Sequence, residues 1–217
     1  MLSTAYLCAA LVAYFIGSIP TGYLVAKAKG VDIRSVGSGN IGATNVFRIL
    51  GKGPGIFVLL VDALKGFGPI FWLAPMCLRA DATANPEWVR IILCVGAILG
   101  HNFTCWLRFK GGKGIATSTG AFLALTPAPL GIAFVTWVVV FALSRYVSLA
   151  SVISAFALPI GAWCLGLSLP LKIVTIVAGA LAVLKHRGNI QRLLAGTETR
   201  VGEKKAVENS EEQEEAK

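Results

Sequence analysis

The chain has 217 residues, of which 55% are hydrophobic and 14% are charged, and its mean hydropathy is +0.72. Soluble domains of this size carry roughly 25% charged residues, so the composition excludes an ordinary soluble domain and indicates an integral membrane protein. The net charge of +9 does not indicate a nucleic-acid partner, because the basic residues flank apolar segments instead of covering a soluble surface.

Long apolar segments predict an all-α, polytopic membrane protein with about seven transmembrane helices and short re-entrant or interfacial segments on the cytoplasmic face. The predicted spans are residues 5–27, 53–75, 88–107, 114–126, 130–147, 149–168 and 171–187. A span needs about 20 apolar residues, which makes the segment 114–126 marginal. Pro20 predicts a kink in the first span.

The basic residues predict how these spans are oriented. With the N-terminus outside, most of the 20 Lys and Arg residues fall on one side, which the positive-inside rule makes cytoplasmic. Without a crossing at 114–126 the later loops would change sides, so the charges favour seven spans. We expect one membrane-embedded domain over residues 1–200. Residues 201–217 are acidic and almost free of apolar side chains, which predicts a disordered cytoplasmic tail.

The first of three polar stretches on the cytoplasmic side is "SVGSGNIGATNVFRILGKG" at 35–53. Gly37, Gly39 and Gly42 match the G-x-G-x-x-G fingerprint of dinucleotide-binding proteins, and Asp62 follows at the expected interval of about 20 residues. No apolar strand precedes the glycines, however, and Asp62 lies inside an apolar span. The match is therefore a weak one in the wrong context.

This stretch is better interpreted as a backbone cradle for an anion. Arg48 is a candidate bidentate partner for a phosphate, and a helix would place it on the same face as Thr44. The candidate hydrogen-bonding side chains are Ser38, Asn40, Thr44 and Asn45. A polar amphipathic helix at the membrane interface is the alternative interpretation.

Asp62 and Lys65 stand one helical turn apart within an apolar span. Charges inside a membrane are costly and are usually paired or functional. We expect an ion pair that faces the helix bundle, in preference to a catalytic role.

The second polar stretch is "GHNFTCWLRFKGGKGIATSTG" at 100–120. Neighbouring glycines allow backbone N–H groups to converge on an anion, and a following helix adds the positive end of its dipole. Lys110 and Lys113 add charge, and Gly114 begins the next apolar run. A Walker A loop is excluded, because Lys113 is not followed by Ser or Thr. The alternative is a flexible loop with membrane-anchoring cations.

The third polar stretch is "KHRGNIQRLLAGTETR" at 185–200, where a helix would align His186, Asn189 and Arg192 in one stripe. Membrane anchoring by Arg192 and a non-catalytic interfacial histidine are the alternatives. Two histidines without a carboxylate cluster predict no metal site, and the chain offers no convincing Ser-His-Asp or Cys-His set. All three stretches return to one face, so they can share a site, although the sequence does not show that they touch.

Together the motifs resemble the bacterial acyl-phosphate:glycerol-3-phosphate acyltransferases of phospholipid synthesis. The matching residues are "GSGNIGATNVFR" (37–48), "GHNFTCWLRFKGGKGIAT" (100–117) and "HRGNIQRLLAGTE" (186–198), supported by "DALKG" (62–66). The resemblance covers nearly all of residues 5–200. It implies a seven-helix enzyme of the bacterial inner membrane, with the N-terminus outside and the C-terminus cytoplasmic. The implied reaction moves a fatty acyl group from acyl phosphate to the 1-hydroxyl of sn-glycerol 3-phosphate, giving lysophosphatidate and phosphate, the first acylation of phospholipid synthesis.

The resemblance also implies the residues of the site. The expected catalytic residues are Ser38, Lys110 and His186. The expected substrate-binding residues are Gly39, Asn40, Thr44, Asn45, Arg48, His101, Gly111, Gly112, Lys113, Gly114, Asn189, Arg192 and Glu198. The expected partners are the two substrates and membrane lipid, with no cofactor, metal or nucleic acid. The sequence leaves the oligomeric state open, with a monomer as the working expectation.

An acyl phosphate is a mixed anhydride that is already activated, so no acyl-enzyme is required. The base is then either His186 or the phosphate of the donor itself, and we favour the donor phosphate with His186 as a phosphate ligand. The competing function is a transporter of small organic phosphates or anions. Carriers usually bind near the midplane and often contain internal repeats, whereas here the polar stretches gather at one face.

Overall fold

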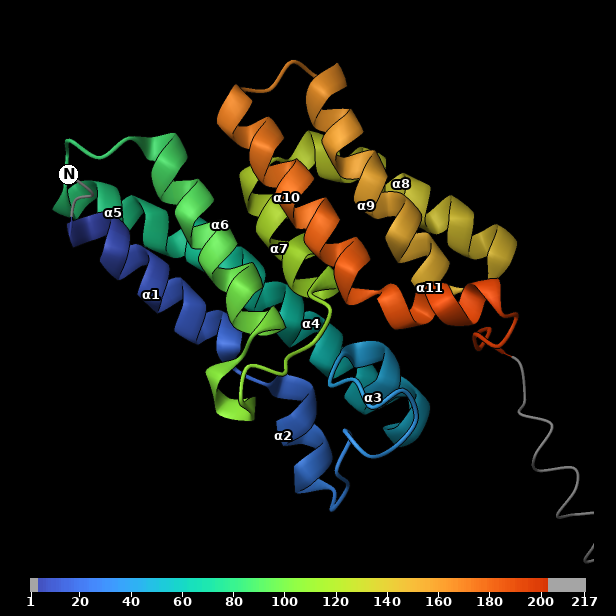
Figure 1. Ribbon diagram of the computed structural model, residues 1–217. Coiled ribbons are helices and arrows are strands. Elements are labelled where there is room, and N and C mark those ends of the chain that lie inside the picture. The colour runs from blue at the N-terminus through green and yellow to red at the C-terminus, as the bar shows by residue number, and fades with distance from the viewer. Residues whose placement is uncertain (1–3, 203–217) are drawn as a thin grey trace, which may run out of the picture.

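The structure is a computed structural model, and it describes residues 4–202. Within that range every regular element is a helix, which agrees with the predicted fold class (Figure 1). The elements are α1 (Thr4–Ser18), α2 (Thr21–Ala28), α3 (Ala43–Leu50), α4 (Lys52–Gly68), the π-helical turn η1 (Pro69–Leu73), α5 (Ala74–Ala80), α6 (Pro86–Asn102), the 3₁₀ turn η2 (Cys105–Leu107), α7 (Ile115–Leu125), α8 (Pro127–Ser144), α9 (Val147–Cys164), α10 (Leu169–Lys185) and α11 (Arg187–Leu194). The predicted acidic tail lies, from residue 203 on, outside the described residues.

Five helical segments are long and apolar enough to cross a membrane, and α10 with α11 adds a sixth if that bent pair is one span. The predicted span 114–126 corresponds to α7, whose 11 residues extend only about 16 Å. A bilayer core is about 30 Å thick, so α7 is too short to cross it alone. The predicted count of seven is therefore approximate among residues 4–202.

The predicted kink at Pro20 is confirmed, because α1 ends at Ser18 and α2 begins at Thr21. Proline cannot donate a backbone hydrogen bond, and the break leaves the Ile19 carbonyl outside both helices. That carbonyl accepts hydrogen bonds from the Thr21 N–H at 3.0 Å and from Lys65 Nζ at 2.7 Å. The predicted pairing of Lys65 with Asp62 is also confirmed, with Nζ 2.8 Å from Oδ1 in the interior.

Glycines bring the helix backbones close together. A Cβ on Gly100 of α6 would lie 2.1 Å from the Tyr14 carbonyl oxygen of α1, and one on Gly120 of α7 would lie 1.8 Å from the Ala63 carbonyl oxygen of α4. Small residues at such contacts are typical of membrane helices, which associate through close packing. The short α7 is thereby held against α4 in the middle of the bundle.

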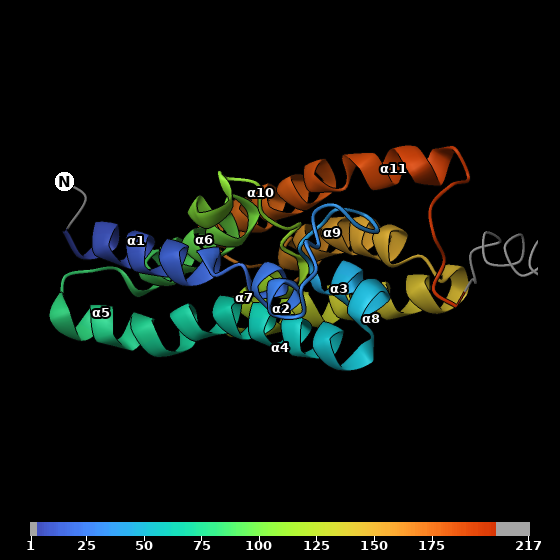
Figure 2. The same ribbon diagram turned by 90° about the horizontal axis from the view of Figure 1, so that it is seen from below.

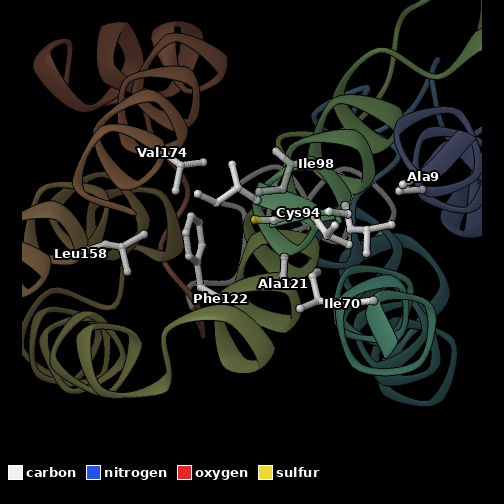
Figure 3. Close-up of a cluster of buried hydrophobic side chains, with 14 of the residues drawn as sticks. Ala9, Ile70, Cys94, Ile98, Ala121, Phe122, Leu158 and Val174 are labelled. Atoms are coloured by element: carbon white, nitrogen blue, oxygen red, sulfur yellow. The ribbon is translucent and has the colours of Figure 1, made fainter. Parts of the chain in front are cut away.

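Side chains of several helices meet in an apolar core around α7. Figure 3 shows Phe122, which is fully buried, between Cys94 and Ile98 on one side and Leu158 and Val174 on the other. The outward faces are apolar as well, as expected for a surface that contacts lipid.

The polar stretches gather at one end of the bundle. Figure 1 shows α2, α3, α11 and the loop 103–114 at this end, opposite the loops 81–85 and 165–168. Figure 2, which views the molecule from below, shows α3 between α4 and α11. Segments far apart in the chain thus converge where the charges lie.

Candidate active site

All three polar stretches line a single cavity of about 460 Å³. Most of the predicted site residues form its polar part: Ser38, Asn40, Thr44, Asn45, Arg48, His101, Lys113, Gly114, His186, Asn189 and Glu198. The others lie outside this lining: Gly39, Lys110, Gly111, Gly112 and Arg192. The stretches that the sequence could only suggest as neighbours do share one site.

Asn45 of α3 organises the first stretch. Its Oδ1 accepts a hydrogen bond from the Ser38 N–H at 2.9 Å, and its Nδ2 donates to the carbonyls of Ile33 at 3.2 Å and Val36 at 3.1 Å. Gly37 beside it has φ +60°, and a Cβ there would lie 2.3 Å from Asn45 Oδ1. Asn45 therefore holds the loop in place, and Ser38 is presented to the cavity.

The second stretch contributes the start of α7. Gly114 precedes the helix in a left-handed conformation with φ +80°, and Gly114, Ile115 and Ala116 line the cavity. The first N–H groups of a helix have no partner within it and carry the positive end of the dipole. This wall can therefore bind an anion such as a phosphate.

Lys113 is the cation that this stretch brings into the cavity. Its Nζ donates a hydrogen bond to Asn189 Oδ1. The pKa of Lys113 is lowered to about 8, chiefly by burial; Glu198 raises it, and the nearby Arg192 and Arg48 lower it. Lys110, in contrast, is exposed and outside the lining, so its predicted role has no support from its position.

Glu198 is the centre of the third stretch. Its Oε1 accepts hydrogen bonds from Asn189 Nδ2 and Ser148 Oγ, and its Oε2 accepts one from Arg192 Nε, each at 2.7 Å. Burial opposes ionisation of Glu198, but these three donors outweigh it and lower the pKa of the carboxyl. The ionised Glu198 thus fixes Asn189 beside Lys113.

His186 stands where α10 and α11 meet and is only 3% exposed. Its Nδ1 lies 2.7 Å from the Ala182 carbonyl oxygen, which requires the proton on Nδ1. A neutral imidazole in this tautomer has Nε2 free to accept a hydrogen bond or a proton. The geometry is compatible with either role that the sequence left open for His186.

The cavity also has an apolar wall that the sequence analysis missed. It comes from α4 and α8: Leu59, Leu60, Ala63, Leu130, Ala133, Phe134 and Trp137. Ser148 of α9, which holds Glu198, was missed as well. Nothing in an apolar membrane helix distinguishes a residue that faces a cavity from one that faces lipid, so no clear sequence signal marked them.

A cationic pocket that joins an apolar wall inside a helical membrane protein is chemically suited to a phosphate that carries an apolar tail. Residues 7–196 match the profile of the family described as "Glycerol-3-phosphate acyltransferase". The chain belongs to the glycerol-3-phosphate acyltransferase family, as its motifs predicted.

Relatives of the chain bear the same name. The glycerol-3-phosphate acyltransferase of Synechococcus sp. (strain JA-3-3Ab) is 46% identical over 200 residues, covering 91% of this chain and 94% of that protein. The Geobacter sulfurreducens protein is 46% identical over 189 residues, covering 87% and 94%.

Two solved structures share the fold. Both are of PlsY (YgiH), an integral membrane glycerol 3-phosphate acyltransferase. Its glycerol 3-phosphate form is 40% identical with a TM-score of 0.82, and covers 91% of this chain and 96% of that one. Its lysophosphatidic acid form is 38% identical with a TM-score of 0.79, and covers 91% and 95%. The predicted fold class, a polytopic helical membrane protein, is confirmed by this similarity.

Proposed function

We propose that this chain transfers a fatty acyl group from acyl phosphate to the 1-hydroxyl of sn-glycerol 3-phosphate, releasing lysophosphatidate and phosphate. Acyl transfer to glycerol 3-phosphate is supported by the names of its relatives and by the two ligand forms of its structural neighbour. The observation that carries the proposal is the cavity itself, in which the cationic end and the apolar wall are continuous. One end suits phosphate groups and the other suits an acyl chain.

We assign the binding of phosphate groups to the cations and helix start that line the cavity. Arg48 and Lys113 supply positive charge, and the first turn of α7 supplies N–H groups. Asn189, held by Glu198, keeps Lys113 in place. The acyl chain would lie along α4 and α8, between Leu60 and Phe134.

In the proposed reaction the 1-hydroxyl oxygen attacks the acyl carbonyl carbon, and the bond from that carbon to the phosphate oxygen breaks. The cations and the helix dipole stabilise the charge that grows on the leaving phosphate. The hydroxyl proton passes to the departing phosphate, either directly or through Nε2 of His186. Ser38 donates a hydrogen bond at the reacting centre. Holding both reactants in one cavity supplies much of the rate, since the donor is already activated.

Purified protein in detergent tests this proposal. The assay contains acyl phosphate and glycerol 3-phosphate, without metal or acyl-CoA, and follows phosphate release. We expect release that depends on both substrates and falls at least 100-fold in Lys113→Ala, because a half-buried charge that binds phosphate is removed. Folded wild-type protein that releases no phosphate would overturn the proposal. Turnover in detergent, where there are no compartments, also separates acyl transfer from transport.

We further propose that the protein resides in the bacterial inner membrane with its N-terminus outside and its C-terminus in the cytoplasm. Support comes from the gathering of the basic stretches at one end of the bundle (Figure 1). A fluorescent protein of a kind that matures only in the cytoplasm should fluoresce when it is fused after residue 217. Activity of a periplasmic reporter at the same position would contradict this orientation.

A further inference from the structure

A buried cluster of charged and polar side chains lies behind the glycine stretch. Asp62 and Lys65 come from α4, and His101 comes from the last turn of α6. They are only 2%, 6% and 4% exposed. Lys65 Nζ joins Asp62 Oδ1 at 2.8 Å and the Ile19 carbonyl at 2.7 Å, so the ion pair is anchored to the break between α1 and α2.

His101 completes this cluster. Its Nδ1 lies 3.8 Å from Asp62 Oδ1, a distance longer than a hydrogen bond. Among residues 4–202 that Nδ1 makes no hydrogen bond, and Asp62 Oδ1 is a charged acceptor 3.8 Å away. A buried polar atom needs a partner, and Asp62 is placed to supply one to the imidazole.

The backbone of the glycine stretch at Gly111 and Gly112 packs closely against His101. The His101 carbonyl accepts a hydrogen bond from the Gly112 N–H at 3.1 Å. A Cβ on Gly111 would lie 2.0 Å from the same carbonyl oxygen, and one on Gly112 would lie 2.1 Å from Nε2 of the ring. Both glycines are thus required by close approach to one residue. The next two residues, Lys113 and Gly114, line the cavity.

The neighbouring residue of α6 supports the same loop. A Cβ on Gly114 would lie 2.5 Å from Asn102 Oδ1, and Lys185 Nζ donates a hydrogen bond to the Asn102 carbonyl at 2.7 Å. The end of α6 therefore shapes the loop. Within this end, the ring of His101 faces the Asp62 carboxylate of α4.

We infer that Asp62 and His101 are a pair of positioning residues: Asp62, anchored by Lys65, sets the ring of His101, and His101 sets the glycine stretch so that Lys113 and the start of α7 meet the phosphate. His101 and Asp62 also line the cavity, so the substrate contact that the sequence analysis expected of His101 stays a prediction beside this action through the loop. The inference rests on the proposed function for its effect on turnover, but not for its effect on the loop.

The test compares wild type, Asp62→Asn, His101→Gln and the double variant, all as full chains in detergent. The first readout is hydrogen exchange of the amides of residues 108–117 without substrate. The second is kcat and KM for glycerol 3-phosphate. The matched control is Thr175→Val on α10, a buried hydroxyl that, within the described part of the chain, donates a hydrogen bond inside its own helix, to the Lys172 carbonyl at 2.7 Å.

Both single variants should speed exchange of the Gly112 amide at least fivefold and lower kcat/KM about 10- to 100-fold, as expected for a loop displaced by about 1 Å. The double variant should be no worse than the poorer single variant, and in a Lys113→Ala background His101→Gln should cost less than about threefold. The Thr175→Val control should lower the melting temperature but leave loop exchange and kcat/KM unchanged.

Unchanged loop exchange in either single variant would overturn the inference, as would losses that multiply in the double variant. If Asp62→Asn does not fold, Gly112→Ala replaces it: this change should damage wild type, yet cost nothing further beside His101→Ala, which removes the ring that the new Cβ meets. Equal damage in both backgrounds would also overturn the inference. A wild type without turnover would instead refute the proposed function, and the exchange data would still decide the role of the pair.

Discussion

Replacing Glu198 with Gln removes the charge at the centre of the third stretch and keeps the size of the side chain. The amide oxygen of the new side chain can still accept hydrogen bonds from Asn189 and Ser148. Its NH2 group, however, would face the Nε–H of Arg192, so that two donors meet. Each buried bond loses about 0.5–1 kcal/mol, since bonds to a charged acceptor are stronger than neutral ones. Arg192 is 43% exposed, so its loss is at most about 1 kcal/mol.

These contributions total about 1–3 kcal/mol, and 1.4 kcal/mol corresponds to a factor of ten. If they fall on the placement of Asn189 and Lys113, kcat/KM for glycerol 3-phosphate drops about 5- to 150-fold. Phosphate release in detergent measures this, with the melting temperature as a check on folding. The control Arg192→Met keeps the carboxylate and should cost less than about fivefold. Wild-type kinetics in Glu198→Gln, or equal damage in Arg192→Met, would refute the reasoning.

Further outcomes follow from the remaining geometry. Because the pKa of Lys113 lies at about 8, its positive charge is present below that pH and is lost above it, so KM for glycerol 3-phosphate should rise about fivefold between pH 8 and pH 9; a Lys113→Arg variant with the same rise would contradict this. Lys110→Ala should change kcat/KM less than about threefold, since Lys110 lies outside the cavity; a loss as large as that of Lys113→Ala would restore Lys110 to the site. Gly120→Ala should destabilise the protein by about 1–3 kcal/mol, because its Cβ would meet the Ala63 carbonyl at 1.8 Å, and an unchanged melting temperature would argue against that packing.

The sequence predicted the family, the helical fold and the break at Pro20 because each depends on local signals. Motifs identify the family, long apolar runs mark the spans, and a proline removes a backbone hydrogen bond of the helix, which at Pro20 coincides with a break. The pairing of Asp62 with Lys65 followed in the same way, from spacing within one turn and the cost of burying charge.

Long-range placement could not be predicted from such signals. Only the fold separates Lys113, inside the cavity, from Lys110, three residues earlier and exposed. Likewise Arg48 Nη2 donates to the Thr199 carbonyl at 3.5 Å across 151 positions of the chain. In the sequence, nothing distinguishes Ser148 from the other serines of its apolar helix. Only the fold brings Glu198 within hydrogen-bond distance of its Oγ.

The central claim is that one cavity brings acyl phosphate and glycerol 3-phosphate together for direct acyl transfer. Its most direct test supplies purified protein in detergent with labelled glycerol 3-phosphate and, in parallel, acyl phosphate, acyl-CoA or acyl carrier protein, and identifies the products by mass spectrometry. We predict 1-acyl-glycerol 3-phosphate from acyl phosphate alone, with one phosphate released for each molecule formed. Product from a thioester donor at an equal or higher rate, or no product from acyl phosphate, would contradict the account.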